Sequence, residues 1–507
     1  MTGNKRQSII SSVAVVTGFS VATRLIAFLF KVFVSRELGA EAVGVYQMAL
    51  SVYFMALTVA ASGIPTVLSR KIAEDEKYGG GRTPSYVTSA FLITVCSSLA
   101  VMAVLYPVAM FLPSAFPDER VLPLVTIMLP ALISTSVYNV VRSWFWGRKS
   151  FIAFSFTETL EEILRIAFTL VFSLGIIRGL SPVKGLSIGF LISDVICALV
   201  LVAFFFIRGG RPGKPAYPGS LLRPSLPLTA TRIFGGAVGA FTALIIPLML
   251  VRNGMSNAEA SATFGRVTGM AMPLLMAPTT LTGALAVVLI PEIATLSKSE
   301  NDALSARIDG SINFSVIISS LFIILYVPLG KEISVFVFND VFSGEYLSNA
   351  ALLLYPIGLN QITASVLNSM GYEKKSFVHY AIGAALLLVC LIVLPGYIGI
   401  YAVAAGSGLC FAVSSAMNLF LINKKANVFR TPGKTLLSLL FVFPAVAIAF
   451  LLKNILLSRI PLFFVIAISG GIPALLYAAC IVAFRIVDVS RFYQRLNGKF
   501  SKKRDTK

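Results

Sequence analysis

Six basic side chains lie inside stretches of this sequence that are otherwise apolar. They are Arg24, Lys31, Arg142, Arg165, Arg232 and Arg266. A basic residue near the centre of a bilayer costs about 2.5 to 3.5 kcal/mol on insertion scales unless it is paired or hydrated. Such charges therefore mark either ion pairs within the protein or a site that attracts an anion, for example a phosphate.

Four of these residues predict a cationic cleft. Arg24 and Lys31 lie two helical turns apart on nearly the same face of one predicted helix. Arg232 lies about two turns into a later helix, and Arg266 lies in the outer part of the helix after it. The alternative is that each long side chain extends to the nearest membrane surface or forms a structural pair. Arg142, near the inner end of its helix, is assigned to membrane topology.

Arg165 differs from the other basic residues because carboxylates surround it in the sequence. Glu158, Glu161 and Glu162 precede it at helical spacings, and Asp194 is predicted at a similar depth in another helix. We predict a buried ion pair between Arg165 and Asp194 or Glu161. An intramembrane relay for protons or cations through Arg165, Asp194, Glu161 and Glu158 is the alternative.

Nothing in the sequence indicates catalysis. The glycine-rich stretch 79–83 lacks the spacing of a phosphate-binding loop, and the single histidine, His379, cannot form a metal cluster. The five cysteines fall in apolar stretches without metal-ligand spacing. We expect no enzyme activity, no cofactor and no metal, and we expect transport to be driven by an ion gradient, the membrane potential or the substrate gradient.

The elements that must position these charges are membrane-spanning helices. The chain has 507 residues, of which 57% are hydrophobic and 13% charged, whereas a soluble protein carries about 25% charged residues. We predict an all-α polytopic membrane protein with about fourteen transmembrane helices. The predicted spans are residues 9–34, 45–69, 86–112, 121–147, 152–175, 183–207, 226–251, 262–296, 308–330, 347–370, 376–395, 398–421, 434–452 and 461–484.

The net charge of +20 comes mainly from Lys and Arg in alternate loops and at the ends of the chain. This pattern follows the positive-inside rule and predicts that both termini lie in the cytoplasm. It argues against nucleic-acid binding and for contacts with membrane lipids, especially at the basic tail 485–507.

A weak internal repeat runs through the chain at an offset of 226 residues. Its matching pairs are Gly39 and Gly265, Ile64-Pro65 and Ile290-Pro291, Pro130 and Pro356, and Lys149-Ser150-Phe151 and Lys375-Ser376-Phe377. Each repeat holds six predicted helices, an even number, so both halves enter the membrane in the same direction. Parallel repeats around a central site are typical of transporters that expose the site to each side in turn.

The repeat predicts the domain organisation. We expect an N-terminal six-helix bundle over 1–207, a cytoplasmic linker over 208–225, a C-terminal six-helix bundle over 226–421, two extra helices over 434–484, and a basic cytoplasmic tail over 485–507. Prolines within the spans are hinge candidates. They are Pro65, Pro291, Pro130, Pro356, Pro273 and Pro278. The last two predict that the helix over 262–296 is bent or interrupted.

Several stretches resemble a known family, the polysaccharide-transport branch of the multidrug, oligosaccharidyl-lipid and polysaccharide flippases. They are LGAEAVGVYQ and ASGIPTVLSRKIAE within 38–74, LPLTATRIFGG and LIIPLML within 226–250, and FGRVTGMAMPLLMAPTTLTGALAVVLIPEIA at 264–294. The resemblance implies a V-shaped pair of six-helix bundles that alternates between inward and outward openings in the bacterial cytoplasmic membrane. The implied cargo is a lipid-linked sugar, namely a peptidoglycan precursor on polyprenyl pyrophosphate for cell-wall or spore-cortex synthesis. The polyprenyl tail would lie in a groove bordered by the two extra helices.

Departures from the similar lipid II flippases leave the cargo open. Arg24 stands where those flippases also carry an arginine in the first helix, but the second predicted helix has none. Arg266 lies nearer the outside than their arginine in the eighth helix. One alternative function is a cation-coupled multidrug exporter, although such exporters commonly use a carboxylate in the first helix, which here carries Arg24 and Lys31. Another is a non-transporting scaffold for cell-wall synthesis.

Overall fold

Helices account for all regular secondary structure in the part of the chain that the structure describes. This computed structural model describes residues 2–61, 63–111, 116–173, 179–294, 301–426 and 432–486. Ten helices there are long and apolar enough to cross a membrane, and the number rises to twelve when each of two bent helix pairs is taken as one span. The all-α polytopic class is confirmed, whereas a total of fourteen spans stays a prediction.

The chain divides into two compact units. The first unit comprises Met1–Gly269 and Leu394–Ile400, and the second comprises Met270–Val393 and Tyr401–Lys507. The division falls within a helical segment and not at the expected linker over 208–225. The reason is that this linker is bound to the first unit: the backbone N–H groups of Gly213 and Ala216 donate to the hydroxyls of Thr88 and Ser89, at 2.9 Å each. The expected six-helix bundles stay a prediction.

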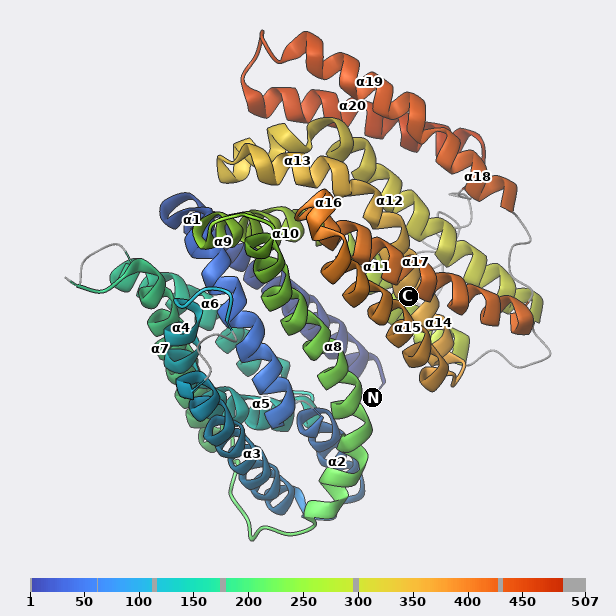
Figure 1. The fold of residues 1–507 in the computed structure, drawn as a ribbon. Helices are drawn as coiled ribbons and strands as arrows, with labels where there is room; N and C mark the ends of the chain where they lie inside the picture. The colour runs from blue at the N-terminus through green and yellow to red at the C-terminus, as the bar shows by residue number, and fades with distance from the viewer. Residues whose placement is uncertain are drawn as a thin grey trace. The chain divides into compact units, whose positions relative to one another are not determined.

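Most helices of the first unit are drawn from blue to green in Figure 1, and one short helix of this unit is drawn in orange. They are α1 (Thr2–Ala61), α2 (Ile64–Tyr78), α3 (Thr83–Phe111), α4 (Val121–Met128), α5 (Ala131–Gly147), α6 (Phe151–Ser173), α7 (Pro182–Ile207), α8 (Pro218–Arg252), α9 (Asn257–Gly265) and the short α16 (Pro395–Ile398). The interior of this unit is an apolar cluster between α2, α3, α5 and α7. Burial of these faces fixes the positions of α5 and α7, which carry polar residues of the site below.

The second unit contains the remaining helices. They are α10 (Met272–Met276), α11 (Thr279–Ala294), α12 (Asn301–Phe338), α13 (Val341–Ala350), the 3₁₀ turn Ala351–Leu353, α14 (Leu354–Ser369), α15 (Glu373–Val393), α17 (Tyr401–Ala426), α18 (Pro432–Leu440), α19 (Val442–Leu456) and α20 (Leu462–Ala483). An apolar cluster between α11, α12, α14 and α17 forms its interior. The extra helices pack on α12, where Lys453 Nζ lies 2.7 Å from Glu332 Oε1 and donates to Pro328 O at 2.8 Å.

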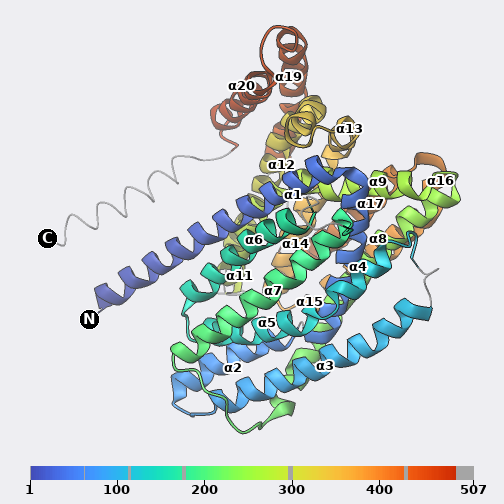
Figure 2. The same cartoon turned by 90° about the vertical axis from the view of Figure 1, so that its left-hand side faces the viewer.

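Helix α1 is broken at Gly39, whose φ of 79° and ψ of 170° are not helical. Figure 2 shows that the ribbon of α1 changes direction along its length. We call residues 2–38 the first half of α1 and residues 40–61 its second half. Only glycine adopts such a positive φ without strain. The repeat-related Gly265 also ends a regular helix, because the π-helical segment Arg266–Ala271 follows it.

The hinge candidates lie at or near helix interruptions. Pro65 is in the first turn of α2, Pro130 is at the 45° bend between α4 and α5, and Pro356 follows the 3₁₀ turn that precedes α14. Pro273 is in the first turn of α10, and Pro278 is at the break between α10 and α11. The expected interruption of the helix over 262–296 is therefore present.

One hinge candidate is left, Pro291, which lies within α11. Its side chain is outside the described residues. A role of any of these prolines in motion stays a prediction.

The second half of α1 packs directly against the backbone of α9. A Cβ atom placed on Gly44 would lie 1.8 Å from Ser261 O, and one placed on Gly265 would lie 2.0 Å from Ala40 O. Two helix backbones can approach this closely only where both carry glycine, because any side chain would occupy the same space. This contact joins α9, which follows α8, to the helix that lines the site described below.

A loop carboxylate reinforces the same contact. Asp118 accepts hydrogen bonds from Arg120 Nε at 3.0 Å and from Ser261 Oγ of α9 at 2.9 Å, and Arg120 also pairs with Glu41 of α1 at 2.6 Å. Burial opposes ionisation of Asp118, but the hydrogen bonds from Arg120 and Ser261 and the charge of Arg120 hold its pKa below the usual value. The ionised carboxylate therefore ties the loop to α1 and α9.

The close contact predicts that Gly44→Ala destabilises the protein. Alanine normally stabilises a helix relative to glycine by roughly 0.5–1 kcal/mol, but here its Cβ would overlap the backbone oxygen of Ser261, and overpacking costs about 1–3 kcal/mol. We expect a lower melting temperature for Gly44→Ala in detergent, measured by size-exclusion chromatography after heating. Gly239→Ala on α8 is the control, since nothing lies within 4 Å of the added Cβ. Equal melting temperatures for the two variants would contradict this packing.

The lowered pKa of Asp118 predicts a pH-dependent contribution to stability. Because the folded pKa lies below the unfolded one, the stabilisation is present at neutral pH and is lost as the pH falls through the folded pKa, under the unperturbed value of about 3.9. We expect Asp118→Asn to lower the melting temperature at pH 7, and the difference from wild type to shrink in acid. Glu119→Gln, an exposed neighbour, should show little difference at either pH. A difference for Asp118→Asn that is constant with pH would refute this interpretation.

Candidate functional site

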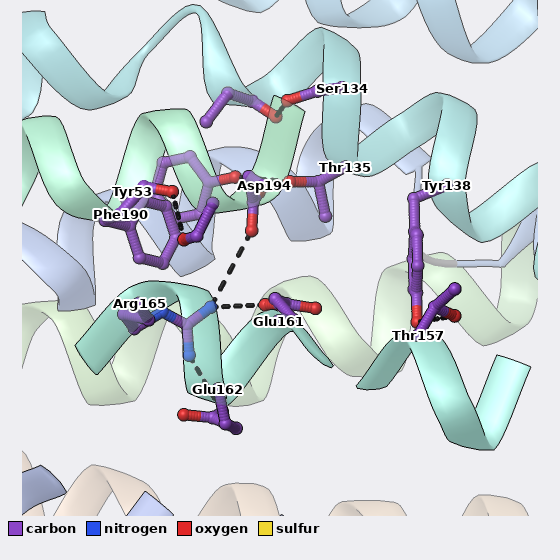
Figure 3. Close-up of polar contacts among 12 residues, drawn as sticks. Tyr53, Ser134, Thr135, Tyr138, Thr157, Glu161, Glu162, Arg165, Phe190 and Asp194 are labelled. Atoms are coloured by element: carbon purple, nitrogen blue, oxygen red, sulfur yellow. Dashed lines mark hydrogen bonds and ion pairs between the residues drawn. The ribbon is translucent and has the colours of Figure 1, made fainter. Parts of the chain in front are cut away.

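The centre of the site is Arg165 on α6, which is surrounded by three carboxylates. Its Nη1 lies 2.8 Å from Glu162 Oε1, and its Nη2 forms an ion pair with Glu161 and lies 3.7 Å from Asp194 Oδ1 (Figure 3). The Arg165 side chain is 13% exposed and that of Asp194 is 8% exposed. Water therefore screens these charges little, and each requires the others as partners. We call these four residues the acidic cluster.

The spacing of the α6 residues explains half of this arrangement. Glu161 and Glu162 precede Arg165 by four and three residues, so one turn of helix places all three on the same face. Asp194 comes from α7, which packs along α6. The guanidinium also lies over the ring of Phe190, 5.0 Å from its centroid and one turn before Asp194, so packing holds it in place.

Hydroxyl groups extend the acidic cluster to two further helices. Thr135 of α5 donates a hydrogen bond to Asp194 Oδ2. A threonine hydroxyl has one proton to donate, so the 2.7 Å hydrogen bond between Tyr53 and Thr135 must have Tyr53 of α1 as its donor. The resulting chain of polar contacts runs from Tyr53 through Thr135 and Asp194 to Arg165 (Figure 3) and connects α1, α5, α7 and α6.

Glu158 does not join the acidic cluster in the structure. Its Oε1 lies 2.5 Å from Arg142 Nη2 of α5, so these two residues form a separate ion pair between α5 and α6. Arg142, which we assigned to topology alone, thus has a structural partner. The expected relay through Arg165, Asp194, Glu161 and Glu158 stays a prediction, and the printed contacts link only the first three of these residues directly.

A cavity of about 250 Å³ lies beside the acidic cluster. One face of each half of α1 lines most of it: Ala27, Phe30, Lys31, Val34 and Ser35 from the first half, and Val43, Tyr46, Gln47, Leu50 and Phe54 from the second. Glu162, Arg165, Phe190 and Gly269 complete the lining. The break at Gly39 is what lets both halves of one helix face the same cavity.

The structure separates the four residues expected in a cationic cleft. Lys31 lines the cavity with Glu162 and Arg165, whereas Arg24, Arg232 and Arg266 are not among its described lining residues. Arg24 is exposed on the first half of α1. Their grouping into a single site stays a prediction.

The two remaining residues of that group lie on other elements. Arg232 is exposed on α8, where its Nη2 donates to Thr66 Oγ1 of α2 at 3.4 Å. Arg266 is partly buried at the first position of the π-helical segment.

Sequence reasoning did not single out several polar residues of this region. Tyr46 and Gln47 line the cavity, and Tyr53 and Thr135 complete the polar chain. A helical face with spacings of three and four residues, from Val43 through Tyr46 and Gln47, would have indicated the lining. The pairing of Thr135 with Asp194 had no signal in the sequence, because the two residues come from different helices.

The acidic cluster has one cation and three carboxylates, and this imbalance predicts the effects of two substitutions. Arg165→Leu would leave three carboxylates without their cation, and removing one partner of a buried ion pair costs about 3–5 kcal/mol. Asp194→Asn leaves Arg165 with Glu161 and Glu162, so its effect should be smaller. We expect folded yield and melting temperature in detergent to fall in the order wild type, Asp194→Asn, Arg165→Leu, with the exposed Glu345→Gln as control. Normal yield of Asp194→Asn with lost gradient coupling would instead assign Asp194 to a relay.

Comparison with known proteins identifies relatives by sequence. The chain is 22% identical to stage V sporulation protein B of Bacillus subtilis (strain 168) over 386 residues, which cover 72% of this chain and 74% of that protein. It is 23% identical to sporulation protein YkvU of the same organism over 370 residues, covering 69% and 80% of the two chains.

Solved structures share the fold. The lipid II flippase MurJ in an inward closed conformation matches with a TM-score of 0.71 and 14% identity, covering 92% of this chain and 99% of that one. An inward-facing multidrug resistance MATE family transporter matches with a TM-score of 0.58 and 16% identity, covering 80% and 94%. The family model described as polysaccharide biosynthesis protein matches residues 9–297, which are more than half of the chain. This multi-pass membrane protein therefore belongs to the polysaccharide biosynthesis protein family.

Proposed function

We propose that this protein is a flippase that moves a sugar linked to polyprenyl pyrophosphate across the cytoplasmic membrane. The lipid-linked oligosaccharides and peptidoglycan precursors of cell-wall or spore-cortex synthesis are the cargo class. Family membership and the fold shared with a lipid II flippase support transport of such a lipid-linked sugar. The protein would act as a transporter and not as an enzyme, with both termini in the cytoplasm.

The observation that carries this proposal is the charge of the cavity. Its charged lining residues are Lys31, Arg165 and Glu162, a net charge of +1. Arg165 is engaged by Glu161, Glu162 and Asp194, so the ammonium group of Lys31 is the cation of this lining that is available to an anion. A cation kept among membrane-spanning helices at an energetic cost is a functional candidate, and a pyrophosphate is the anionic part of the proposed cargo.

The size of the cavity limits what it holds. About 250 Å³ is below the range of roughly 300–1,000 Å³ that is typical of sites for drug-sized ligands. The cavity would therefore receive the charged head group, while the sugar and the polyprenyl chain lie outside it. We propose that Arg24, Arg232 and Arg266 contact the pyrophosphate at other stages of an alternating-access cycle, with the hinge prolines as the moving points.

The acidic cluster supports a second candidate, a cation-coupled exporter. Three carboxylates face one guanidinium, so the cluster carries an excess of negative charge that would attract a proton or a cation. The fold is also shared with a multidrug resistance transporter. In the flippase, the same cluster would serve to couple cargo movement to an ion gradient.

The test is transbilayer movement of a fluorescent polyprenyl-pyrophosphate-linked saccharide in proteoliposomes that contain the full-length protein. We expect movement by the wild type and a tenfold or larger loss in Lys31→Gln, since a charge-assisted hydrogen bond contributes about 1.5–3 kcal/mol. Lys184→Gln is the matched control, because Lys184 is exposed at the start of α7 and does not line the cavity.

Each other outcome rejects the proposal in a different way. Efflux of a cationic dye under an ion gradient, without movement of the saccharide, would favour the exporter. Movement by the wild type that Lys31→Gln leaves unchanged would remove the cavity from the mechanism. If neither cargo moves, the scaffold is left as the explanation, and Lys31 should then tolerate substitution in cells.

A further inference from the structure

A second charged hollow lies at the end of the first unit, where α2 and α5 finish. It is a cleft of about 860 Å³. Its charged lining residues are Arg70, Glu74, Glu76, Lys77, Arg148 and Lys149. Within the described part of the chain it shares no lining residue with the cavity of the acidic cluster. Four basic side chains against two acidic ones give this basic cleft a net charge of +2.

Both carboxylates of the basic cleft are already neutralised. Glu76 Oε1 lies 2.6 Å from Arg148 Nη2 and also accepts from Arg148 Nε at 2.7 Å. Glu74 Oε2 lies 2.9 Å from Nζ of Lys71.

Three cations of the basic cleft are left over from these pairs. Among the described residues, no ion pair involves Arg70, Lys77 or Lys149, and all three are exposed. These three cations have no acidic partner at ion-pair distance within the described part of the chain, so they are available to an anion from outside.

The floor of the basic cleft is rigid. A Cβ on Gly147 would lie 2.7 Å from Ile72 side-chain atoms and 2.9 Å from Ser69 O, so the end of α5 packs directly on α2. Arg148 lies over the ring of Trp144, 4.4 Å from its centroid. Lys149 follows with a φ of 57°, a left-handed conformation that is uncommon outside glycine. The end of α5, which carries Arg148 and Lys149, is thus packed against α2.

The basic cleft lies at the predicted surface of the membrane. Arg70 directly follows the predicted span 45–69, and Gly147 is the last residue of the predicted span 121–147. Exposed aromatic side chains stand beside these charges, Tyr78 at 76% and Trp146 at 48% exposure. Such aromatic residues are typical of the level of the lipid head groups. A basic pocket at this level, on the side that carries the positive loops, fits an anionic lipid head group.

We propose that the basic cleft binds the phosphate of an anionic membrane lipid, with Arg70, Lys77 and Lys149 as its ligands. This lipid site is separate from the cargo cavity and does not depend on the proposed function. An anionic lipid bound there would join α2 to the end of α5 and stabilise that end of the first unit.

The two tryptophans of the chain make the proposal directly measurable. Trp144 and Trp146 are the only tryptophans in the sequence, and both adjoin the basic cleft, so intrinsic fluorescence reports on this region alone. The full-length protein is placed in phosphatidylcholine nanodiscs that contain an equal mole fraction of either brominated phosphatidylglycerol or brominated phosphatidylcholine. Bromine quenches tryptophan at short range, so preferential binding appears as stronger quenching by the anionic lipid.

We expect the wild type to be quenched more by brominated phosphatidylglycerol, and Arg70→Gln and Lys149→Gln each to weaken that preference about fivefold. The variant Arg211→Gln/Lys214→Gln removes two exposed basic charges from the linker and should keep the preference. Either of the two single variants suffices if the other does not fold.

Three results would overturn the proposal. Equal quenching of the wild type by the two brominated lipids would show that no anionic lipid is selected. A preference that survives in both single variants would place the lipid elsewhere. If inorganic phosphate abolishes the preference and changes the fluorescence in pure phosphatidylcholine nanodiscs, the basic cleft recognises soluble phosphate, and the lipid assignment fails.

Discussion

The high cost of an unpaired charge among membrane-spanning helices is the constraint on which the first unit depends. Arg165 satisfies it by contacting Glu161 and Glu162 on its own helix and Asp194 on α7. These contacts specify how α6 and α7 are rotated about their axes, because any other rotation would leave a buried charge alone. The hydroxyls of Thr135 and Tyr53 extend the same requirement to α5 and α1.

Glycine residues determine the path and the packing of α1. The break at Gly39 turns α1 so that both of its halves line the same cavity. The contact between Gly44 and Gly265 then brings the second half of α1 against α9 at a distance that no side chain permits. The Asp118 network closes over that contact from the loop before α4. Backbone geometry and ionic pairing thus position the same helix.

The charges of the first unit fall into two groups with different consequences. Paired groups, such as Arg142 with Glu158, hold helices together and leave little charge for a ligand. Lys31 in the cavity and Arg70, Lys77 and Lys149 in the basic cleft have no carboxylate partner at ion-pair distance among the described residues, so their positive charge is available to a ligand.

The sequence alone determined the fold class and the identity of the charged residues. A long apolar stretch that crosses a membrane must hydrogen-bond its own backbone groups, which a helix does. The helical spans therefore followed from hydropathy. The i, i+4 spacing on α6 placed Glu161 beside Arg165, and Pro273 and Pro278 indicated where the helix over 262–296 is interrupted. These features are local, since each depends on residues within a turn or two of one another.

The tertiary structure decided which of the other charges meet. Arg24, Lys31, Arg232 and Arg266 are alike in the sequence, yet only Lys31 lines the cavity. Likewise, Glu158 lies two turns before Arg165 on the same face of α6, but it pairs with Arg142 of α5. The physical reason is that these partners lie on different helices, whose rotation and depth are set by the packing of the whole unit and not by the residues next to them in the chain.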